Sequence, residues 1–321
     1  MRVLIVTDKP DWSYWQIAQA IQRHNTDPDL TIDIMALKGH ESEFLSVEKR
    51  YSSVLIMGFQ MAQSRSMRWA LDGDRWKTGI HSAHSFDPDL LTTPDDDVAP
   101  PWPLILFLRK FRGVNVVSDR LHRLFSDEKL NNAPTHPEYK VHPIYTPNGV
   151  DTDLFKPTTP LSMEGPLRVG FAGTAKGIHD RRKGLREYAI PACEKAGVEL
   201  VAAVARTETA LPPSAMPAFH NSYDVFLLPS SSEGFSIALL EAAACGRVVV
   251  STRVGGSTEL IHHGEDGFLV DRSVDAIADL LRGLRDNRKQ MQEIGAAMRQ
   301  KVEKLWSWKV RAPAWLEFIR T

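Results

Sequence analysis

Short apolar runs alternate with amphipathic segments along most of the chain. The first run, RVLIVT at residues 2–7, is continuous and short, as in a strand buried on both faces. Residues 12–23 follow it with apolar positions at helical spacing. The same alternation predicts a strand that ends at residue 80, other strands at 31–37, 53–57, 114–117 and 139–145, and helices near 61–71, 104–111 and 118–125. Repeated β-α units of this length predict a doubly wound parallel sheet.

The alternation is interrupted at a turn-rich stretch and then starts again. Residues 147–157 contain Asn148-Gly149 and Pro157, and a linker-like segment follows. Beyond it the pattern predicts strands at 167–173, 198–204, 223–228, 248–251 and 268–270, and helices at 236–244, 274–284 and 288–304. We therefore predict two α/β Rossmann-like domains. The first covers residues 1–155 and is completed by a C-terminal helix at 307–321, and the second covers residues 156–306.

Residues 229–246, PSSSEGFSIALLEAAACG, join a polar turn to an almost wholly apolar helix. A helix that is apolar all round is buried, so the carboxylate of Glu241 inside it is expected to have a polar partner. A buried strand precedes the turn. A strand, a Gly-containing loop and a helix N-terminus together direct backbone N–H groups at an anion.

Composition narrows the classes of function. The chain has 321 residues, 43% hydrophobic and 25% charged, and a formal net charge of -1, which allows two cores and gives no indication of nucleic-acid binding. Cys193 and Cys245 lie in apolar stretches without metal or redox spacing, which favours a reducing compartment. No run approaches 18 apolar residues, so we expect a cytoplasmic protein without a membrane span. No HExxH spacing or carboxylate-histidine cluster indicates a metal, and the Asp-rich turns are interpreted as solvated loops.

Four motifs stand in an order that resembles the retaining GT-B glycosyltransferases with the Glu-x7-Glu motif. They are PNGVDTDLFKP at 147–157, EGFSIALLE at 233–241, VGGSTELIHHGEDGFLV at 254–270 and WSW at 306–308. The resemblance covers nearly the whole chain. It implies a GT-B fold, in which an acceptor domain and a donor domain face each other across a cleft. It also implies metal-independent transfer of a sugar from a nucleoside-diphosphate sugar to a glycan, lipid-linked or small-molecule acceptor, as in polysaccharide biosynthesis, with no other cofactor.

The resemblance assigns the donor residues. Glu233 matches the glutamate near the sugar hydroxyls and Glu241 the one that accepts hydrogen bonds from the ribose hydroxyls, as a carboxylate can from a vicinal diol. The alternative for Glu233 is a solvated acid at a helix N-terminus. Lys183 resembles the lysine that neutralises the donor diphosphate.

The chain departs from the family pattern beside that lysine. The usual arginine after the first strand of the donor domain is replaced by Thr174, so Arg181 or Arg182 is a candidate substitute, with ordinary surface residues as the alternative. Backbone groups need no particular side chain to bind phosphate oxygens. The candidates for such binding, or for close approach of the backbone, are Gly173, Thr174, Gly234, Phe235, Ser236, Gly255 and Gly256.

The acceptor domain gives weaker signals. His81 and His84 follow a strand end, and one of them would resemble the family histidine near the sugar; His81 is preferred because it follows directly. The first loop contains no glycine, so Asp8 and Trp12 are candidates for the acceptor side, although Trp12 could equally be a hydrophobic staple. The run LILFLRKFR at 104–112 is favoured as a core helix over one lying on an anionic membrane.

Two other functions stay open from the sequence. One is a nucleotide-sugar epimerase on the same scaffold. The other is a non-catalytic sugar-nucleotide-binding module, for which the Thr174 substitution and the glycine-free first loop would be signs of degeneration.

Overall fold

The computed structural model describes residues 1–83, 100–126, 141–175 and 177–321, and the chain divides into two compact units. Within the described residues, unit 1 contains 1–83, 100–126, 141–148 and 308–321, and unit 2 contains 149–307. The first division thus falls after residue 148, whereas the pattern placed it after 155. Residues 149–155 are held by unit 2, since Val150 N–H donates to the Trp306 carbonyl (2.9 Å) and Arg299 Nη1 to the Phe155 carbonyl (2.7 Å).

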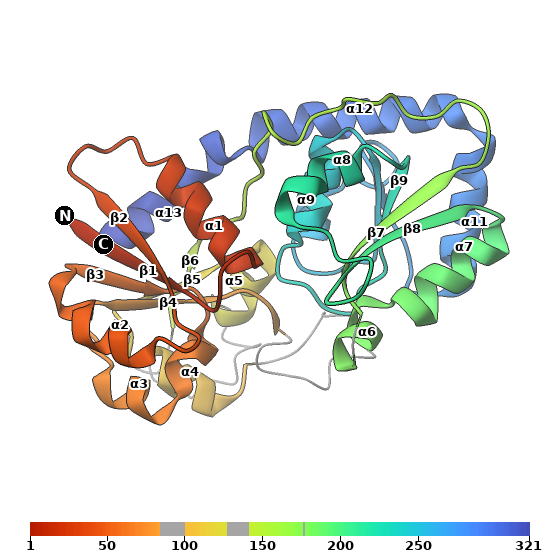
Figure 1. Ribbon diagram of the computed structural model, residues 1–321. Helices are drawn as coiled ribbons and strands as arrows, with labels where there is room; N and C mark the ends of the chain where they lie inside the picture. The colour runs from red at the N-terminus through yellow and green to blue at the C-terminus, as the bar shows by residue number, and fades with distance from the viewer. Residues whose placement is uncertain (84–99, 127–140, 176) are drawn as a thin grey trace. The chain divides into compact units, whose positions relative to one another are not determined.

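Unit 1 is built on a parallel sheet (Figure 1). Its described strands lie in the order β2-β1-β3-β4-β5-β6. They are β1 (Arg2–Thr7), β2 (Thr31–Ala36), β3 (Ser53–Ile56), β4 (Trp76–Ile80), β5 (Gly113–Val116) and β6 (Ile144–Tyr145). The helices are α1 (Ser13–Arg23), α2 (Glu41–Val47), α3 (Arg65–Ala70), α4 (Trp102–Leu108), α5 (Asp119–Ser126) and α13 (Trp308–Arg320).

Helices cover both faces of this sheet. Leu4 and Val6 of β1 pack in a buried cluster with Phe44 of α2 and Met67 of α3, while α1 and α13 contact each other on the opposite side (Figure 1). The C-terminal end of α13 is fixed by Lys77 of β4, whose buried Nζ donates to the carbonyls of two residues in the last turn, at 2.8 and 3.0 Å. The last helix is therefore an integral part of unit 1.

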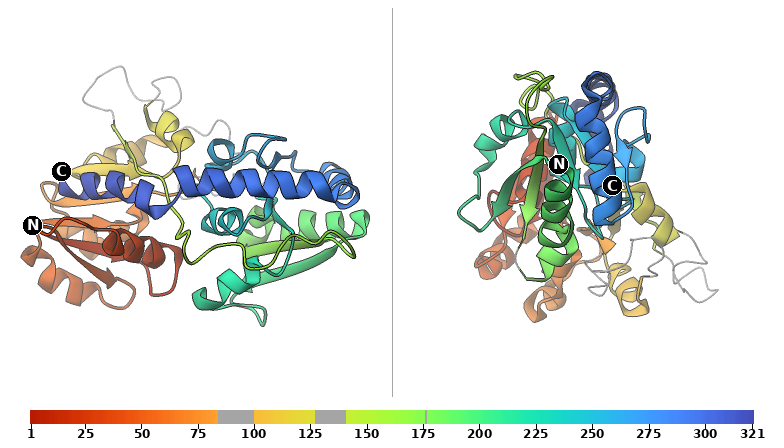
Figure 2. Two further views of the ribbon diagram at one scale, coloured as in Figure 1. Left: turned by 90° about the horizontal axis from the view of Figure 1, so that it is seen from above. Right: turned by 90° about the vertical axis from the view of Figure 1, so that its right-hand side faces the viewer.

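Unit 2 contains a second parallel sheet, of order β11-β10-β9-β7-β8 among the described strands. The strands are β7 (Arg168–Thr174), β8 (Glu199–Ala205), β9 (Val225–Leu228), β10 (Val248–Ser251) and β11 (Phe268–Leu269). The helices are α6 (Ile178–Lys183), α7 (Ile190–Ala196), α8 (Met216–His220), α9 (Ile237–Ala244), α10 (Ser257–Leu260), α11 (Val274–Asp286) and α12 (Arg288–Leu305), with a π-helical turn at Leu185–Ala189. Figure 2 shows the length of α12.

The core of unit 2 follows from its apolar strands. Val169, Phe171 and Val225 point into one buried cluster with residues of α7 and α11, so these helices pack on the same face of the sheet. The apolar helix α9 packs against α8 and α12. Six of its residues are buried, as its composition predicts.

The doubly wound α/β architecture agrees with the sequence pattern, and the deviations are local. The pattern did not predict α2, α6, α8 or α10, which are short. α2, for example, buries only Phe44. Between residues 185 and 196 the helical structure is divided, because Pro191 lies in the first turn of α7, directly after the π-helical turn. No helix in the described ranges is long and apolar enough to span a bilayer.

Candidate active site

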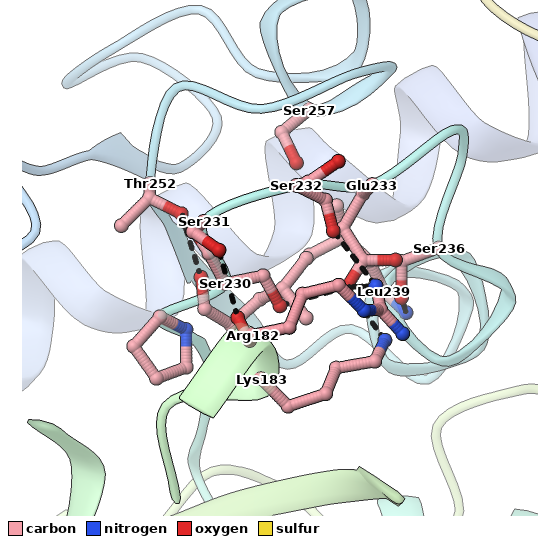
Figure 3. Close-up of polar contacts among 12 residues, drawn as sticks. Arg182, Lys183, Ser230, Ser231, Ser232, Glu233, Ser236, Leu239, Thr252 and Ser257 are labelled. Carbon is pink, nitrogen blue, oxygen red and sulfur yellow. Dashed lines mark hydrogen bonds and ion pairs between the residues drawn. The ribbon is translucent and has the colours of Figure 1, made fainter. Parts of the chain in front are cut away.

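Glu233 lies in the loop between β9 and α9, where three side chains converge on one of its oxygens (Figure 3). Its Oε1 accepts a hydrogen bond from Lys183 Nζ at 2.6 Å and one from Ser230 Oγ at 2.7 Å. Arg182 Nη1 lies 3.5 Å from the same oxygen. The carboxylate is 8% exposed, so these contacts compensate for the loss of water. Glu233 is therefore buried and paired, and it is not a solvated acid at a helix N-terminus.

Arg182 and Lys183 reach this position because α6 ends beside the Ser-rich loop. Arg182 Nη1 donates to the Ser232 carbonyl (2.8 Å), and the Arg182 carbonyl accepts from Ser231 N–H (2.8 Å). The Nε atom of Arg182 is buried and has no hydrogen-bond partner within the described ranges. Unpaired buried donors are uncommon in folded proteins. This cationic donor could therefore pair with an anionic ligand.

The electrostatics of the cluster favour an anion as well. Burial raises the pKa of Glu233, but the charges of Lys183 and Arg182 and the hydrogen bonds from Lys183 and Ser230 outweigh it and lower that pKa below its usual value. Burial, followed by the charge of Arg182, lowers the pKa of Lys183 although Glu233 opposes the shift. Burial and the charges of Arg182, Arg206 and Lys183 lower the pKa of His179 in turn. Glu233 contributes one negative charge beside the two positive charges of Arg182 and Lys183, so an added negative charge would be stabilised.

Two glycines lock the Glu233 loop against the loop that follows β10. Gly256 N–H donates to the Gly234 carbonyl at 2.8 Å. A Cβ atom at Gly256 would lie 2.0 Å from the Phe235 ring, and one at Gly255 would lie 2.2 Å from the carbonyl oxygens of residues 233 and 234. Only glycine permits this approach. Both glycines therefore shape the loop that carries Glu233.

Helix α9 begins at the end of the same loop. Ser236 is its N-cap and its side chain accepts from Leu239 N–H at 3.3 Å. Phe235 packs on Trp306, with ring centroids 4.8 Å apart. The N-terminal N–H groups of α9 thus follow directly after Glu233 in the chain, as the sequence predicts.

Glu241, one turn or more into α9, contacts a buried histidine. Its Oε2 lies 3.0 Å from Nε2 of His220, and His220 Nδ1 is hydrogen-bonded to the hydroxyl of Tyr223. Glu241 is 7% exposed. This contact supplies the polar partner that its place in an apolar helix requires.

The remaining donor-side candidates divide into two groups. Gly173 and Thr174 end β7, and a Cβ atom at Gly173 would lie 3.6 Å from Lys183 Cδ, so this strand end lies beside the lysine. Arg181 is separate: its side chain is 58% exposed and lies 3.8 Å from Glu187. The geometry therefore brings Arg182 rather than Arg181 to Glu233.

The candidates of the acceptor domain lie in unit 1. His81 follows β4, with its ring 4.7 Å from that of Tyr14 and 6.1 Å from that of Trp315 between centroids. Burial lowers the pKa of His81 to about 3, so the imidazole is neutral at physiological pH. Trp12 is the N-cap residue of α1, and Lys9 Nζ lies 3.2 Å from its ring centroid. His84 lies outside the described residues.

Asp8 follows β1 at the carboxyl edge of the same sheet. Its Oδ1 is buried without a hydrogen-bond partner in the part of the chain that the structure describes. Unit 1 therefore shows single candidate residues where unit 2 shows a connected cluster.

Three polar residues of the unit 2 site were not singled out from the sequence. Ser230 binds Glu233 directly, and its place in Ser230-Ser231-Ser232 before the glutamate was a usable signal. His220 contacts Glu241 from 21 residues away, a distance at which sequence gives no pairing signal. Arg206 follows β8 with a φ of 65°, a conformation that non-glycine residues seldom adopt.

Part of the chain that carries this site is similar to known proteins. Residues 168–287 match the family described as "Glycosyl transferases group 1". A "GDP-mannose-dependent alpha-(1-6)-phosphatidylinositol monomannoside mannosyltransferase" of Mycobacterium tuberculosis is 36% identical over 113 residues. That match covers 33% of this chain and 29% of the mycobacterial protein, so it spans less than a third of that relative's length.

Solved structures resemble the whole chain at low sequence identity. A sucrose-phosphate synthase from Thermosynechococcus elongatus is 13% identical with a TM-score of 0.71, covering 100% of this chain and 98% of that one. Anabaena HepE, solved in complex with UDP-glucose, is 14% identical with a TM-score of 0.67 and full coverage of both chains. These matches confirm the predicted GT-B fold of two Rossmann-like domains.

Proposed function

We propose that this chain, whose residues 168–287 match the family of group 1 glycosyltransferases, is an enzyme that transfers a hexose or related sugar from a nucleoside-diphosphate sugar to an acceptor. The observation that carries this proposal is the buried cluster of Glu233, Lys183 and Arg182 at the N-terminal side of α9. It combines excess positive charge with a fixed carboxylate, and a diphosphate joined to a sugar has the complementary groups.

Each part of the donor has a proposed binding group. Lys183 and Arg182 hold the diphosphate, assisted by backbone N–H groups of residues 173–174 and 234–236. Glu233 accepts hydrogen bonds from the sugar hydroxyls. Glu241 accepts hydrogen bonds from the ribose hydroxyls, for which its buried carboxylate is already oriented by His220.

The proposed reaction retains the configuration of the sugar. The bond between the anomeric carbon and the diphosphate oxygen breaks, and its electron pair stays on the diphosphate. The acceptor oxygen bonds to the anomeric carbon from the same face through an oxocarbenium-like state, and its proton passes to the departing phosphate. Lys183 and Arg182 contribute by stabilising the negative charge that grows on the leaving group.

We also propose that transfer needs no metal ion. Sites that use a divalent cation place it against the phosphates to neutralise their charge. Lys183 and Arg182 already supply two positive charges beside Glu233, held at 2.6 and 3.5 Å from its Oε1. The measurement that checks this is transfer activity in excess EDTA, which is expected to equal that in Mg²⁺.

The acceptor is proposed to be a glycan, a lipid-linked sugar or a small molecule, bound through unit 1. His81, Asp8 and Trp12 are the proposed contact residues, with the neutral His81 near the transferred sugar. Buried Cys193 and Cys245, neither in a disulfide, agree with a reaction in the reducing cytoplasm.

Peripheral association with an anionic membrane is favoured by the surface of α3 and α4. Trp69 of α3 is 81% exposed and Leu106 of α4 is 40% exposed. The Arg68 guanidinium lies 5.5 Å from the ring centroid of Phe107, which places the two helices side by side, and Arg109 and Lys110 are exposed after α4. The inner face of α4 is buried in the core, as expected from the sequence, and the membrane contact is proposed for its outer face.

Liposome sedimentation tests the membrane proposal. Exposed apolar and basic groups bind anionic bilayers through insertion and charge together. The chain is expected to bind phosphatidylserine-containing vesicles and not neutral ones, and Trp69→Ser to weaken that binding. Val310→Ser, at another exposed apolar position, is the matched control. Equal binding by both variants would contradict the proposal.

A donor screen tests the enzymatic proposal. UDP-glucose and GDP-mannose come first, because HepE was solved with the former and the mycobacterial relative is named for the latter. A donor at 100 times its Kd raises the free energy of unfolding by about 2.7 kcal/mol. At least one nucleotide sugar is expected to do so, and Glu233→Gln to abolish its turnover. If no donor among UDP, GDP, ADP and dTDP sugars stabilises the chain, the proposal fails.

A further inference from the structure

Two buried residues connect the carboxylate of Glu241 to the core of unit 2. His220, the last residue of α8, contacts Glu241 through Nε2 at 3.0 Å and Tyr223 through Nδ1. His220 and Tyr223 are both 0% exposed. The three side chains form a continuous series of hydrogen bonds that ends at the proposed ribose site.

The histidine is held in an apolar surrounding. The rings of Phe155, Phe219 and Phe226 lie 5.9, 5.5 and 5.9 Å from its own, all in edge-to-face arrangements. In such a medium a polar group must satisfy its hydrogen bonds within the protein. The imidazole therefore keeps Glu241 and Tyr223 as its two partners.

The direction of the hydrogen bonds follows from the tyrosine. Burial raises the pKa of Tyr223 well above its usual value, with further contributions from Cys245 and Glu241, so the phenol keeps its proton. The phenol hydrogen can therefore be donated to Nδ1 of the imidazole, and because the Glu241 carboxylate only accepts hydrogen bonds, Nε2 carries the other hydrogen. Nε2–H donates to Glu241 Oε2. One of about four acceptor positions of the carboxylate is used in this way, and the others stay available for hydroxyl donors.

We propose that His220 and Tyr223 are positioning residues, which hold the Glu241 carboxylate in the orientation that accepts hydrogen bonds from both ribose hydroxyls of the donor nucleotide. The inference rests on the proposed function, in which Glu241 binds the ribose. Neither residue touches the nucleotide itself. They act by fixing an acceptor that would otherwise lose free energy of binding in becoming ordered.

The packing of β7 makes room for the tyrosine. A Cβ atom at Gly170 would lie 2.2 Å from Tyr223 Cε1, and residue 170 pairs with Phe226 in the sheet. Only glycine at this position lets the ring lie beside the strand. The backbone of the donor domain is thus shaped around this hydrogen-bonded series.

The experiment compares two kinds of nucleotide on the full chain. Binding of UDP and GDP, and of their 2′,3′-dideoxy counterparts, is measured by calorimetry. Tyr223→Phe removes one hydroxyl and is expected to lower affinity for the ribonucleotide about tenfold, which is about 1.4 kcal/mol. Affinity for the dideoxynucleotide is expected to stay unchanged, since that ligand lacks the hydroxyls that Glu241 accepts. A loss of general fold would lower both affinities.

Three further variants complete the test. His220→Leu should lose ribose discrimination as Tyr223→Phe does, and His220→Gln should recover part of it, because the amide N–H can replace Nε2–H. Phe219→Leu is the matched control: it packs on both rings, so it should lower stability and leave discrimination unchanged. If Tyr223→Phe binds both nucleotides as the wild type does, or loses both equally, the inference is overturned.

Glu241→Ala separates this inference from the proposed function. In the proposed function this variant binds the ribonucleotide no better than the dideoxynucleotide. If it still discriminates, Glu241 does not bind the ribose, and both the assignment and the inference fail. If it stops discriminating while the Tyr223 and His220 variants behave as wild type, the assignment stands and only the positioning role fails.

Discussion

The two sheets of this protein end in very different chemistry at their carboxyl edges. In unit 2, Glu233 is bound by Lys183 and Ser230, and Glu241 by His220, so charged groups are paired and held before any ligand arrives. In unit 1, buried oxygens of Asp8, Ser82 and Asn115 have no hydrogen-bond partner within the described ranges.

The difference shows that the same fold can prepare a site in two ways. Fixed, paired charges favour one class of ligand strongly, because no reorganisation is needed when it binds. The buried oxygens of unit 1 without a partner instead leave hydrogen bonds for a ligand to complete, as a hydroxyl-rich acceptor would. The match to the glycosyltransferase family also differs between the two units, since it covers residues 168–287 and these all lie in unit 2.

The largest effect is expected at Lys183. Lys183→Ala removes the cation that stabilises the leaving diphosphate and leaves Glu233 with only part of its compensation, so kcat should fall about 100- to 1,000-fold. Initial rates with the donor found in the screen measure this. Lys195→Ala, which breaks an exposed pair with Asp275, is the control and should keep wild-type activity. If Lys183→Ala keeps more than a third of the wild-type kcat, the paired charges of unit 2 do not have the catalytic importance that distinguishes this unit from unit 1.

A substitution in the loop of unit 2 should come next. Gly256→Ala forces a Cβ atom against the Phe235 ring, 2.0 Å away in the present structure, and is expected to lower the free energy of unfolding by about 1–3 kcal/mol. Chemical denaturation measures it. The control is Gly283→Ala in α11, where a Cβ would meet no atom within 4 Å among the described residues and stability should rise by up to about 1 kcal/mol. Equal effects of the two would contradict the packing argument.

A substitution at the proposed acceptor site of unit 1 should change kcat and leave the affinity for the donor unchanged. His81→Gln keeps a neutral polar side chain but shifts its atoms, so kcat is expected to fall about tenfold, about 1.4 kcal/mol in the barrier. The Kd for the donor nucleotide should not change, because its proposed contacts lie in unit 2. Steady-state kinetics and calorimetry on one preparation check both. A weakened Kd with unchanged kcat would reverse the roles given to the two units.

The smallest effect is a pH dependence of stability in unit 1. The pKa of His81 is about 3 in the folded chain against 6.5 as its ordinary value, so below pH 6.5 the unfolded chain binds a proton that the folded chain does not. The free energy of unfolding therefore falls as the pH decreases through this range, by about 1 kcal/mol between pH 6.5 and 5.5. The free energy of unfolding, measured by urea denaturation, should therefore decrease less between pH 7.5 and 5.5 in the His81→Gln variant than in the wild type. His262→Gln, at a 64% exposed side chain, should not show this difference, and equal slopes for both would contradict the prediction.

Much of the fold was predictable because it depends on local patterns. RVLIVT is apolar throughout and forms β1, which is buried except at Arg2. The apolar run at 236–244 was predicted as a helix and forms α9, with Ser236 as its N-cap. In each case the residues that decide the element lie within one turn or strand of each other. α2 was not predicted because a seven-residue helix with one buried side chain has almost no periodic signal.

The site was predictable only where its residues are close in sequence or match a motif. Arg181 and Arg182 are adjacent residues of the same type, so the sequence does not distinguish them. Neighbouring helical residues point about 100° apart, and only Arg182 reaches Glu233. His220 finds Glu241 through the packing of α8 against α9, which depends on the whole sheet. The acceptor side has no such motif, and its residues stay predictions.

Unit 1 is discontinuous in the chain, and this has a consequence for biosynthesis. Trp315 Nε1 donates to the Pro147 carbonyl (2.9 Å), and Lys77 Nζ to the Phe318 carbonyl (2.8 Å), so α13 is needed to finish a sheet whose strands are made first. Among the described residues, unit 2 contains only the segment 149–307. On the ribosome, domains fold as their residues emerge. The second unit can therefore mature while the first still waits for its last helix, which reverses the order of synthesis.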